Sequence, residues 1–78
     1  MRAKLVIPSS KGITYNYPLH VEYHEQQPVL VTSRGRTMDG PYFQLLRDRM
    51  GAWIETTESP VVAHLLGLPE DAAGLVPA

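Results

Sequence analysis

The stretch ITYNYPLHVEYH, residues 13–24, decides the fold because its apolar and polar side chains alternate along the chain. Alternation with a period of two places odd-numbered and even-numbered residues on opposite faces of a β-strand. Two shorter runs, Arg2–Ile7 and Pro28–Ser33, continue the pattern, with branched side chains mainly at odd positions. Together the three runs predict an antiparallel β-meander within residues 1–34 whose odd-numbered face is apolar.

The polar residues between these runs indicate two hairpin turns and therefore set the expected register. One hairpin is centred on Ser10 and the other on Gln26. The second hairpin would place Tyr23 opposite Val29, so that apolar side chains pair across the strands on one face. Pro18 lies inside the longest run and cannot donate a ladder hydrogen bond, so we expect a bend or bulge there.

Two helices are predicted after the meander. Apolar residues recur with a helical period over residues 39–55, which predicts a main helix whose N-cap is Asp39 or Gly40. A shorter helix over residues 59–67 ends in a glycine that suits the left-handed position after a helix. Residues 68–78 are then expected to form a C-terminal tail.

The expected architecture is a single α+β domain that covers residues 1–78. A three-stranded antiparallel meander (β-β-β) is followed by two helices that pack on one face of the sheet, and the other face stays open. A chain of this length has room for one core only, and its stability is expected to be marginal. Dimerisation is a common remedy for a small domain without a disulfide or a structural metal.

Composition argues against several classes of protein. The net charge of −1 is unlike that of a dedicated polyanion binder. All seven basic residues lie within residues 1–49, together with four of the eight acids. No run approaches the ~18 apolar residues that a membrane helix needs. The chain has no cysteine, which fits a reducing compartment. We therefore expect a cytoplasmic protein with no membrane contact.

His20, Glu22 and His24 form the first candidate site, because they project from one face of the same predicted strand. Two imidazoles and a carboxylate are ligands that Zn²⁺ accepts. The polar face of a half-buried strand is expected to be polar at every second position in any case. The three residues are therefore weak candidates for a metal site, and no cofactor is expected.

The loop from Arg34 to Arg36 is the second candidate site. Two guanidinium groups that lead toward a predicted helix N-terminus suit a phosphate or another anion. No Walker-type or dinucleotide-binding spacing is present. Together with the basic side chains of the even-numbered face, this loop forms the alternative prediction, a nucleic-acid-binding surface. The tyrosines, which would be needed for stacking, are assigned to the odd-numbered face instead.

These patterns favour a small non-enzymatic protein–protein interaction module, an accessory or inhibitor protein that binds a macromolecular partner through the open sheet face. Open faces and sheet edges are natural sites of association, and the same surface would serve a homodimer. No nucleophile is spaced to pair with a base, so no catalytic residue is assigned. The predicted partner-binding residues are Lys4, Asn16, His20, Glu22, His24, Leu30, Thr32, Arg34 and Arg36.

Overall fold

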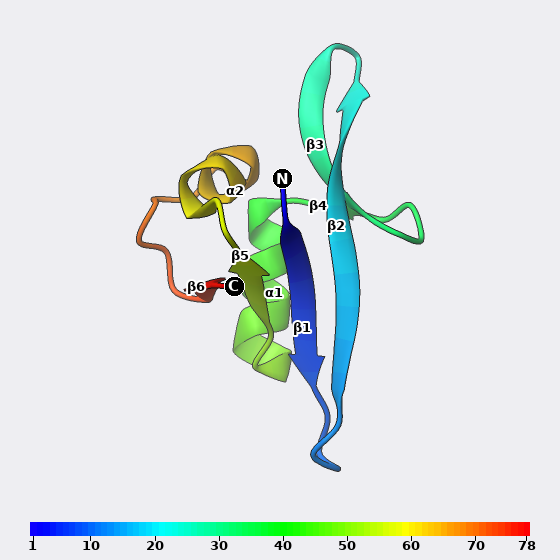
Figure 1. Cartoon of the computed structure of the whole chain (residues 1–78), viewed down its shortest axis with the longest axis vertical. Helices are drawn as coiled ribbons and strands as arrows, with labels where there is room; N and C mark the ends of the chain where they lie inside the picture. Colours follow the sequence, from blue (N-terminus) through cyan, green and yellow to red (C-terminus); the bar gives the residue numbers. More distant parts are fainter.

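The computed structural model describes all 78 residues and contains six strands and two helices (Figure 1). The elements in chain order are β1 (Ala3–Pro8), β2 (Thr14–His24), β3 (Gln27–Thr32), β4 (Thr37–Met38), α1 (Gly40–Met50), β5 (Trp53–Thr56), α2 (Ser59–Leu66) and β6 (Leu75–Pro77). The longest strand, β2, runs along the long axis of the molecule and takes part in two hairpins.

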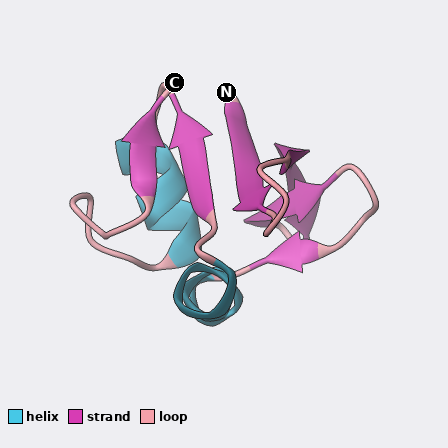
Figure 2. Cartoon of the chain, turned by 90° about the horizontal axis from the view of Figure 1, so that it is seen from below, coloured by secondary structure: helices cyan, strands magenta, loops and turns pink.

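The six strands form one mixed sheet in the order β4-β3-β2-β1-β5-β6. Every neighbouring pair is antiparallel except β5 and β6, which run parallel. The chain is thus an α+β domain, but the predicted three-stranded meander followed by two helices is wrong. Three further strands extend the sheet, and two of them come after the first helix. Viewed along the long axis, the strands point in widely different directions, so the sheet is strongly twisted (Figure 2).

The turn between β2 and β3 shifts the expected register by one residue. Only Glu25 and Gln26 form this turn, and both have a positive φ, of 52° and 67°, as a type I′ hairpin turn requires. The ladder therefore pairs Val21 with Leu30 and not with Val31. A shift of one residue moves every side chain of a strand to the opposite face. Leu30 and Thr32 of β3 consequently face the helices, whereas Val29 and Val31 lie on the other face of the sheet, where Val31 is nevertheless buried.

The hairpin of β1 and β2 departs from the prediction by two residues, so its assignment of faces is unchanged. Ile7 lies opposite Tyr15 and not opposite Ile13. The ladder continues through Pro18 without a break in register, and the expected bulge is absent. Pro18 needs no partner on its other side, because the pairing of β2 with β3 already ends at Leu19.

Helix α1 starts as predicted but ends earlier. The Asp39 side chain accepts a hydrogen bond from the backbone N–H of Tyr42 at 2.8 Å and so caps the helix. Gly51, with a φ of 66°, ends it in the left-handed conformation, and its N–H donates to the carbonyl of Arg47. The predicted helix over 39–55 is therefore too long at its C-terminal end.

The segment after α1 shows why the predicted helix is too long. Trp53 and Ile54 fit the spacing of the helical stripe, but they lie in β5, paired with Val6 and Leu5 of β1. Ile54 is completely buried there. Two adjacent apolar residues fit either a helical or a strand period. Only the backbone conformation of Gly51 separates the helix from the strand.

Helix α2 agrees with its predicted range to within one residue, and Gly67 ends it with a φ of 68°. The predicted tail over 68–78 is wrong in part, because Leu75–Pro77 forms β6 beside β5. The order β5-α2-β6 supplies the crossover that two parallel neighbours need. Gly74 lets the returning chain pass over α1, since a Cβ there would lie 2.8 Å from the Phe43 ring.

A single cluster of ten buried apolar residues joins one face of the sheet to both helices. Its members are Leu5, Leu19, Leu30, Met38, Phe43, Leu46, Ala52, Ile54, Val62 and Leu66. The two ends of β2 extend beyond this core, so Tyr15 and Tyr23 are 52% and 73% exposed, and Ile13, just before the strand, is 55% exposed. The predicted odd-numbered core is therefore correct for the middle of β2 and wrong for its ends.

Candidate functional site

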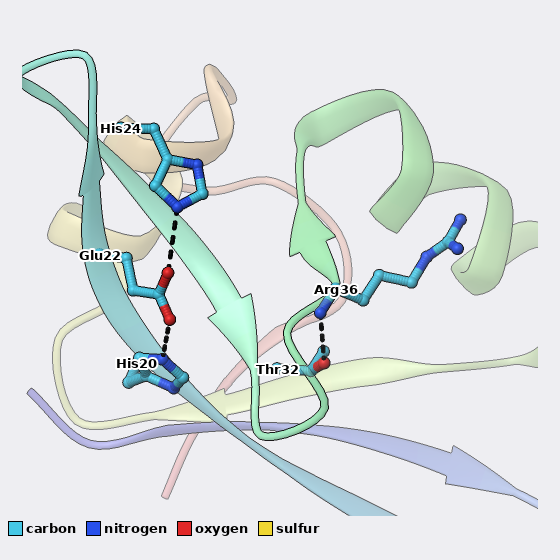
Figure 3. A network of polar contacts seen from close by, with 5 residues as sticks. All are labelled: His20, Glu22, His24, Thr32 and Arg36. Carbon is cyan, nitrogen blue, oxygen red and sulfur yellow. Dashed lines mark hydrogen bonds and ion pairs between the residues drawn. The ribbon is translucent and has the colours of Figure 1, made fainter.

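Three even-numbered side chains of β2 form a row on the sheet face opposite the core (Figure 3). His20 Nε2 lies 2.7 Å from one carboxylate oxygen of Glu22, and His24 Nε2 lies 3.0 Å from the other. Each imidazole donates to the carboxylate, so the three side chains satisfy one another. The hydrogen bonds from His24 and His20 hold the pKa of Glu22 below its usual value. We call these three residues the histidine row.

The arrangement of the histidine row is not that of a metal site. No group of three or more histidine, aspartate or glutamate side chains in the chain is placed so as to hold a metal ion. Both imidazoles are turned toward the carboxylate between them, whereas metal ligands converge on one point. The alternative of metal binding through His20, Glu22 and His24 finds no support in this geometry.

A second polar group on the same face is also paired internally. Lys4 Nζ lies 3.5 Å from a carboxylate oxygen of Glu55, and the Trp53 indole N–H donates to the other oxygen at 3.0 Å. The hydrogen bond from Trp53 lowers the pKa of Glu55, and the charge of Lys4 lowers it further. Asn16 is exposed on β2. Of the predicted contact residues, Lys4 thus already has a partner and Asn16 does not lie in any cavity.

Two of the predicted contact residues are interior residues. Leu30 is completely buried in the core cluster, and Thr32 is only 6% exposed. The one-residue register shift explains both, because it turns the even-numbered side chains of β3 toward the helices. Their assignment to an open sheet face is therefore wrong.

Thr32 closes the turn that carries the two predicted anion-binding residues, Arg34 and Arg36. Its backbone N–H donates to the carbonyl of Arg36 at 2.8 Å, and its hydroxyl accepts from the backbone N–H of Arg36 at 3.1 Å (Figure 3). Gly35, with a φ of 84°, donates to the carbonyl of Thr32 at 2.9 Å. These hydrogen bonds make residues 32–36 a closed turn, which we call the arginine turn.

The arginine turn forms one wall of a cleft on the core side of the sheet, opposite the first two turns of α1. The cleft has a volume of about 220 Å³. We call it the arginine cleft, and its lining residues are Leu5, Ile7, Tyr17, Thr32, Arg34, Arg36, Met38, Tyr42 and Leu46. Strands β1 and β2 supply the floor, so the cleft combines an apolar base with a cationic wall.

Both arginines of the cleft lack an acidic partner. Neither Arg34 nor Arg36 takes part in any ion pair, and no acid lines the cleft. The Arg36 guanidinium lies 4.2 Å from the centroid of the Tyr42 ring, in a cation–π contact. Figure 3 shows its side chain extending toward α1 and away from the histidine row. The nearby Asp39 carboxylate accepts from the helix N-terminus instead.

A larger and more open depression, of about 530 Å³, lies at the other end of β1. Its charged lining includes Lys4 and Glu55, which pair with each other, and Arg2, which takes part in no ion pair. This depression therefore combines an acid with one unpaired arginine, whereas the arginine cleft has two unpaired arginines and no acid.

Sequence reasoning misses the aromatic part of the arginine cleft. Parity assigns Tyr17 to the core, and helical spacing assigns Tyr42 to the buried stripe, yet both line the cleft. A strand of 11 residues spans about 36 Å, whereas a helix of 11 residues spans only about 16 Å. One helix of this length cannot cover the whole odd-numbered face. Even the longer predicted helix over 39–55 would span only about 26 Å, and this mismatch with the predicted strand is a sequence signal for an uncovered aromatic surface.

No helix of the structure is long and apolar enough to cross a membrane. Comparison with models of known protein families, with curated proteins and with solved structures gave no significant match.

Proposed function

We propose that this chain is a small non-enzymatic binding module that holds a segment of a partner protein in the arginine cleft. The observation that carries the proposal is the presence of two unpaired guanidinium groups above an apolar floor. Arginine and aromatic side chains are enriched at the energetic centres of protein–protein interfaces. Occupation of the cleft would act sterically or competitively, as expected of an accessory or inhibitor protein.

The open sheet face supports this function less well than the cleft does. Its charged side chains pair among themselves, as Glu22 does with both histidines and Lys4 does with Glu55. A partner that covered these pairs would remove water from them without supplying a better hydrogen bond. Arg34 and Arg36, by contrast, can form new charge-assisted hydrogen bonds with acidic groups of a partner.

The dimensions of the cleft favour binding over catalysis. Its volume of about 220 Å³ lies below the ~300–1,000 Å³ typical of pockets that enclose a small molecule. The only aliphatic hydroxyl in its lining is that of Thr32, which accepts a hydrogen bond from the arginine turn. No histidine or carboxylate lines the cleft to act as a base.

One observation favours nucleic acid as a second candidate ligand. Tyr17 and Tyr42 line the same cleft as the two arginines, although the sequence pattern separates the tyrosines from the basic side chains. Bases of single-stranded nucleic acid stack on aromatic rings and on guanidinium planes. The net charge of −1 weighs against this candidate, because affinity for nucleic acid comes mainly from many phosphate contacts.

A capture experiment with matched variants tests the proposal. The wild-type chain, the double variant Arg34→Glu with Arg36→Glu, and the control Arg49→Glu are immobilised and exposed to nuclease-treated extract of the native host. Arg49 is exposed on α1, has no acidic partner and lies outside the cleft. We expect a protein that is retained by the wild type and the control and lost from the double variant. Equal retention by all three chains contradicts the proposal.

A further inference from the structure

We propose that the occupant of the arginine cleft is a segment of the partner protein in which an acidic residue stands beside a large apolar residue. This inference rests on the proposed function and names the chemistry that the segment must carry. The apolar side chain enters the hollow above Leu5 and Ile7, and the carboxylate lies against Arg34 and Arg36.

The size and floor of the hollow determine the apolar part of the ligand. A volume of about 220 Å³ suits one large side chain and not a cofactor. Leu5 and Leu46 are buried beneath it, whereas Ile7 and Tyr17 are half-buried and supply its exposed apolar surface. A side chain that covers this floor removes apolar surface from water on both partners, which favours binding.

Arg36 is preorganised to receive a carboxylate. Its backbone is held through the hydroxyl of Thr32, and its guanidinium carbon lies 4.2 Å from the centroid of the Tyr42 ring. The cation–π contact uses no N–H group of Arg36 as a hydrogen-bond donor to a protein acceptor, so these N–H groups remain available for a carboxylate. Two parallel N–H groups match the two oxygens of one carboxylate, and a side chain that is already ordered loses little entropy on binding.

Arg34 adds a second unpaired guanidinium group to the cleft, which strengthens the case for an acidic occupant. It lines the same cleft from the other side of Gly35, and no acid of the chain lies there to neutralise the two guanidinium groups. A purely apolar occupant would take water from both cations and give them no partner, which is unfavourable. An occupant with an adjacent carboxylate supplies that partner.

The experiment uses three short peptides and the ¹⁵N-labelled full chain at low salt. The first peptide is acetyl-Gly-Glu-Phe-Glu-Gly-amide; in the second Gln replaces each Glu, and in the third Ala replaces Phe. We expect the first peptide to shift the amide signals of Arg34, Gly35, Arg36 and Tyr42. Each altered peptide should bind about ten-fold more weakly or worse, because each lacks one half of the recognition.

Variants of the chain locate the interaction. Arg34→Gln with Arg36→Gln should reduce the affinity for the first peptide about ten-fold or more, whereas the control Arg49→Gln should leave it unchanged. The dispersion of the amide spectrum shows whether the variants remain folded. If the double variant does not fold, the single variant Arg34→Gln, which keeps the contact of Arg36 with Tyr42, takes its place.

Several outcomes overturn the inference. Equal affinity for the three peptides does so, as do shifts confined to the histidine row. Tighter binding of octathymidylate than of the first peptide, at the same salt concentration, would assign the cleft to nucleic acid. Concentration-dependent shifts of the cleft without any peptide, abolished by Glu25→Arg at the exposed hairpin tip, would assign it to a second copy of the chain.

The two proposals fail in distinguishable ways. If the peptides do not bind but the capture experiment still yields a protein that depends on Arg34 and Arg36, only the ligand chemistry is wrong. If capture also fails to depend on these residues, the cleft is not the contact surface and the proposed function is removed as well.

Discussion

The arginine cleft and the histidine row lie on opposite faces of the same sheet, and their polar groups are used in different ways. In the row, the Glu22 carboxylate satisfies both imidazoles, at 2.7 and 3.0 Å. In the cleft, the backbone of residues 32–36 is closed by hydrogen bonds, but the guanidinium groups have no acidic partner. The paired groups of the row already satisfy one another, whereas the unpaired cations on a fixed turn remain free to bind a ligand.

The histidine row and the arginine turn look alike as sequence motifs but differ in the structure. Two histidines around a glutamate and two arginines around a glycine are both short clusters of polar residues with a plausible ligand. The structure distinguishes them by how their hydrogen-bonding groups are occupied and by whether an apolar cavity lies beside them. A ligand-binding cluster needs groups that folding has left unused.

The register of β3 turns Leu30 into the core and so determines which residues lie on each face. Leu30→Ala should lower the free energy of unfolding by about 2–5 kcal/mol, because it removes a completely buried side chain and leaves a cavity. Chemical denaturation measures the change. The matched control Val29→Ala lies on the opposite face and is only half-buried, so it should cost clearly less. A larger loss for Val29→Ala would mean that the register is wrong.

The second test concerns the hydrogen bond that closes the arginine turn. Thr32→Val should lower the free energy of unfolding by about 1 kcal/mol, because the backbone N–H of Arg36 loses its hydroxyl acceptor. Hydrogen exchange at the Arg36 amide should become faster, and binding at the cleft should weaken. Thr14→Val, at an exposed position of β2, should change neither. An unchanged exchange rate in Thr32→Val would show that the hydroxyl does not hold the turn.

The histidine row should give the smallest effect, which appears only in acid. The pKa of Glu22 is lowered in the folded chain by hydrogen bonds from His24 and His20. A carboxyl with a lowered folded pKa stabilises the protein above its unfolded pKa, about 4.5, and loses this contribution as the pH falls through the folded pKa. Melting temperatures between pH 6 and pH 2 should therefore converge for the wild type and Glu22→Gln below pH 4.5. The control Glu25→Gln, whose carboxyl has no ion-pair partner, should show no such convergence.

Much of the local structure is predictable from the sequence. The alternation over residues 13–24 places β2, Asp39 caps α1, and Gly67 ends α2. Each of these features depends on residues within one element or one turn. The candidate site is predictable only in part: Arg34 and Arg36 are found by their composition, but their neighbours in the cleft come from distant segments.

The sequence by itself determined the strand period of β2, the N-cap of α1, the glycine that ends α2 and the identity of the two arginines, because these follow from interactions between residues close along the chain. Only the tertiary structure decided the register of β3, since Glu25-Gln26 adopts a turn that usually needs glycine or asparagine. It also decided that the chain beyond α1 returns as β5 and β6. The arginine cleft exists for the same reason, because an 11-residue strand extends past the helix that covers its middle.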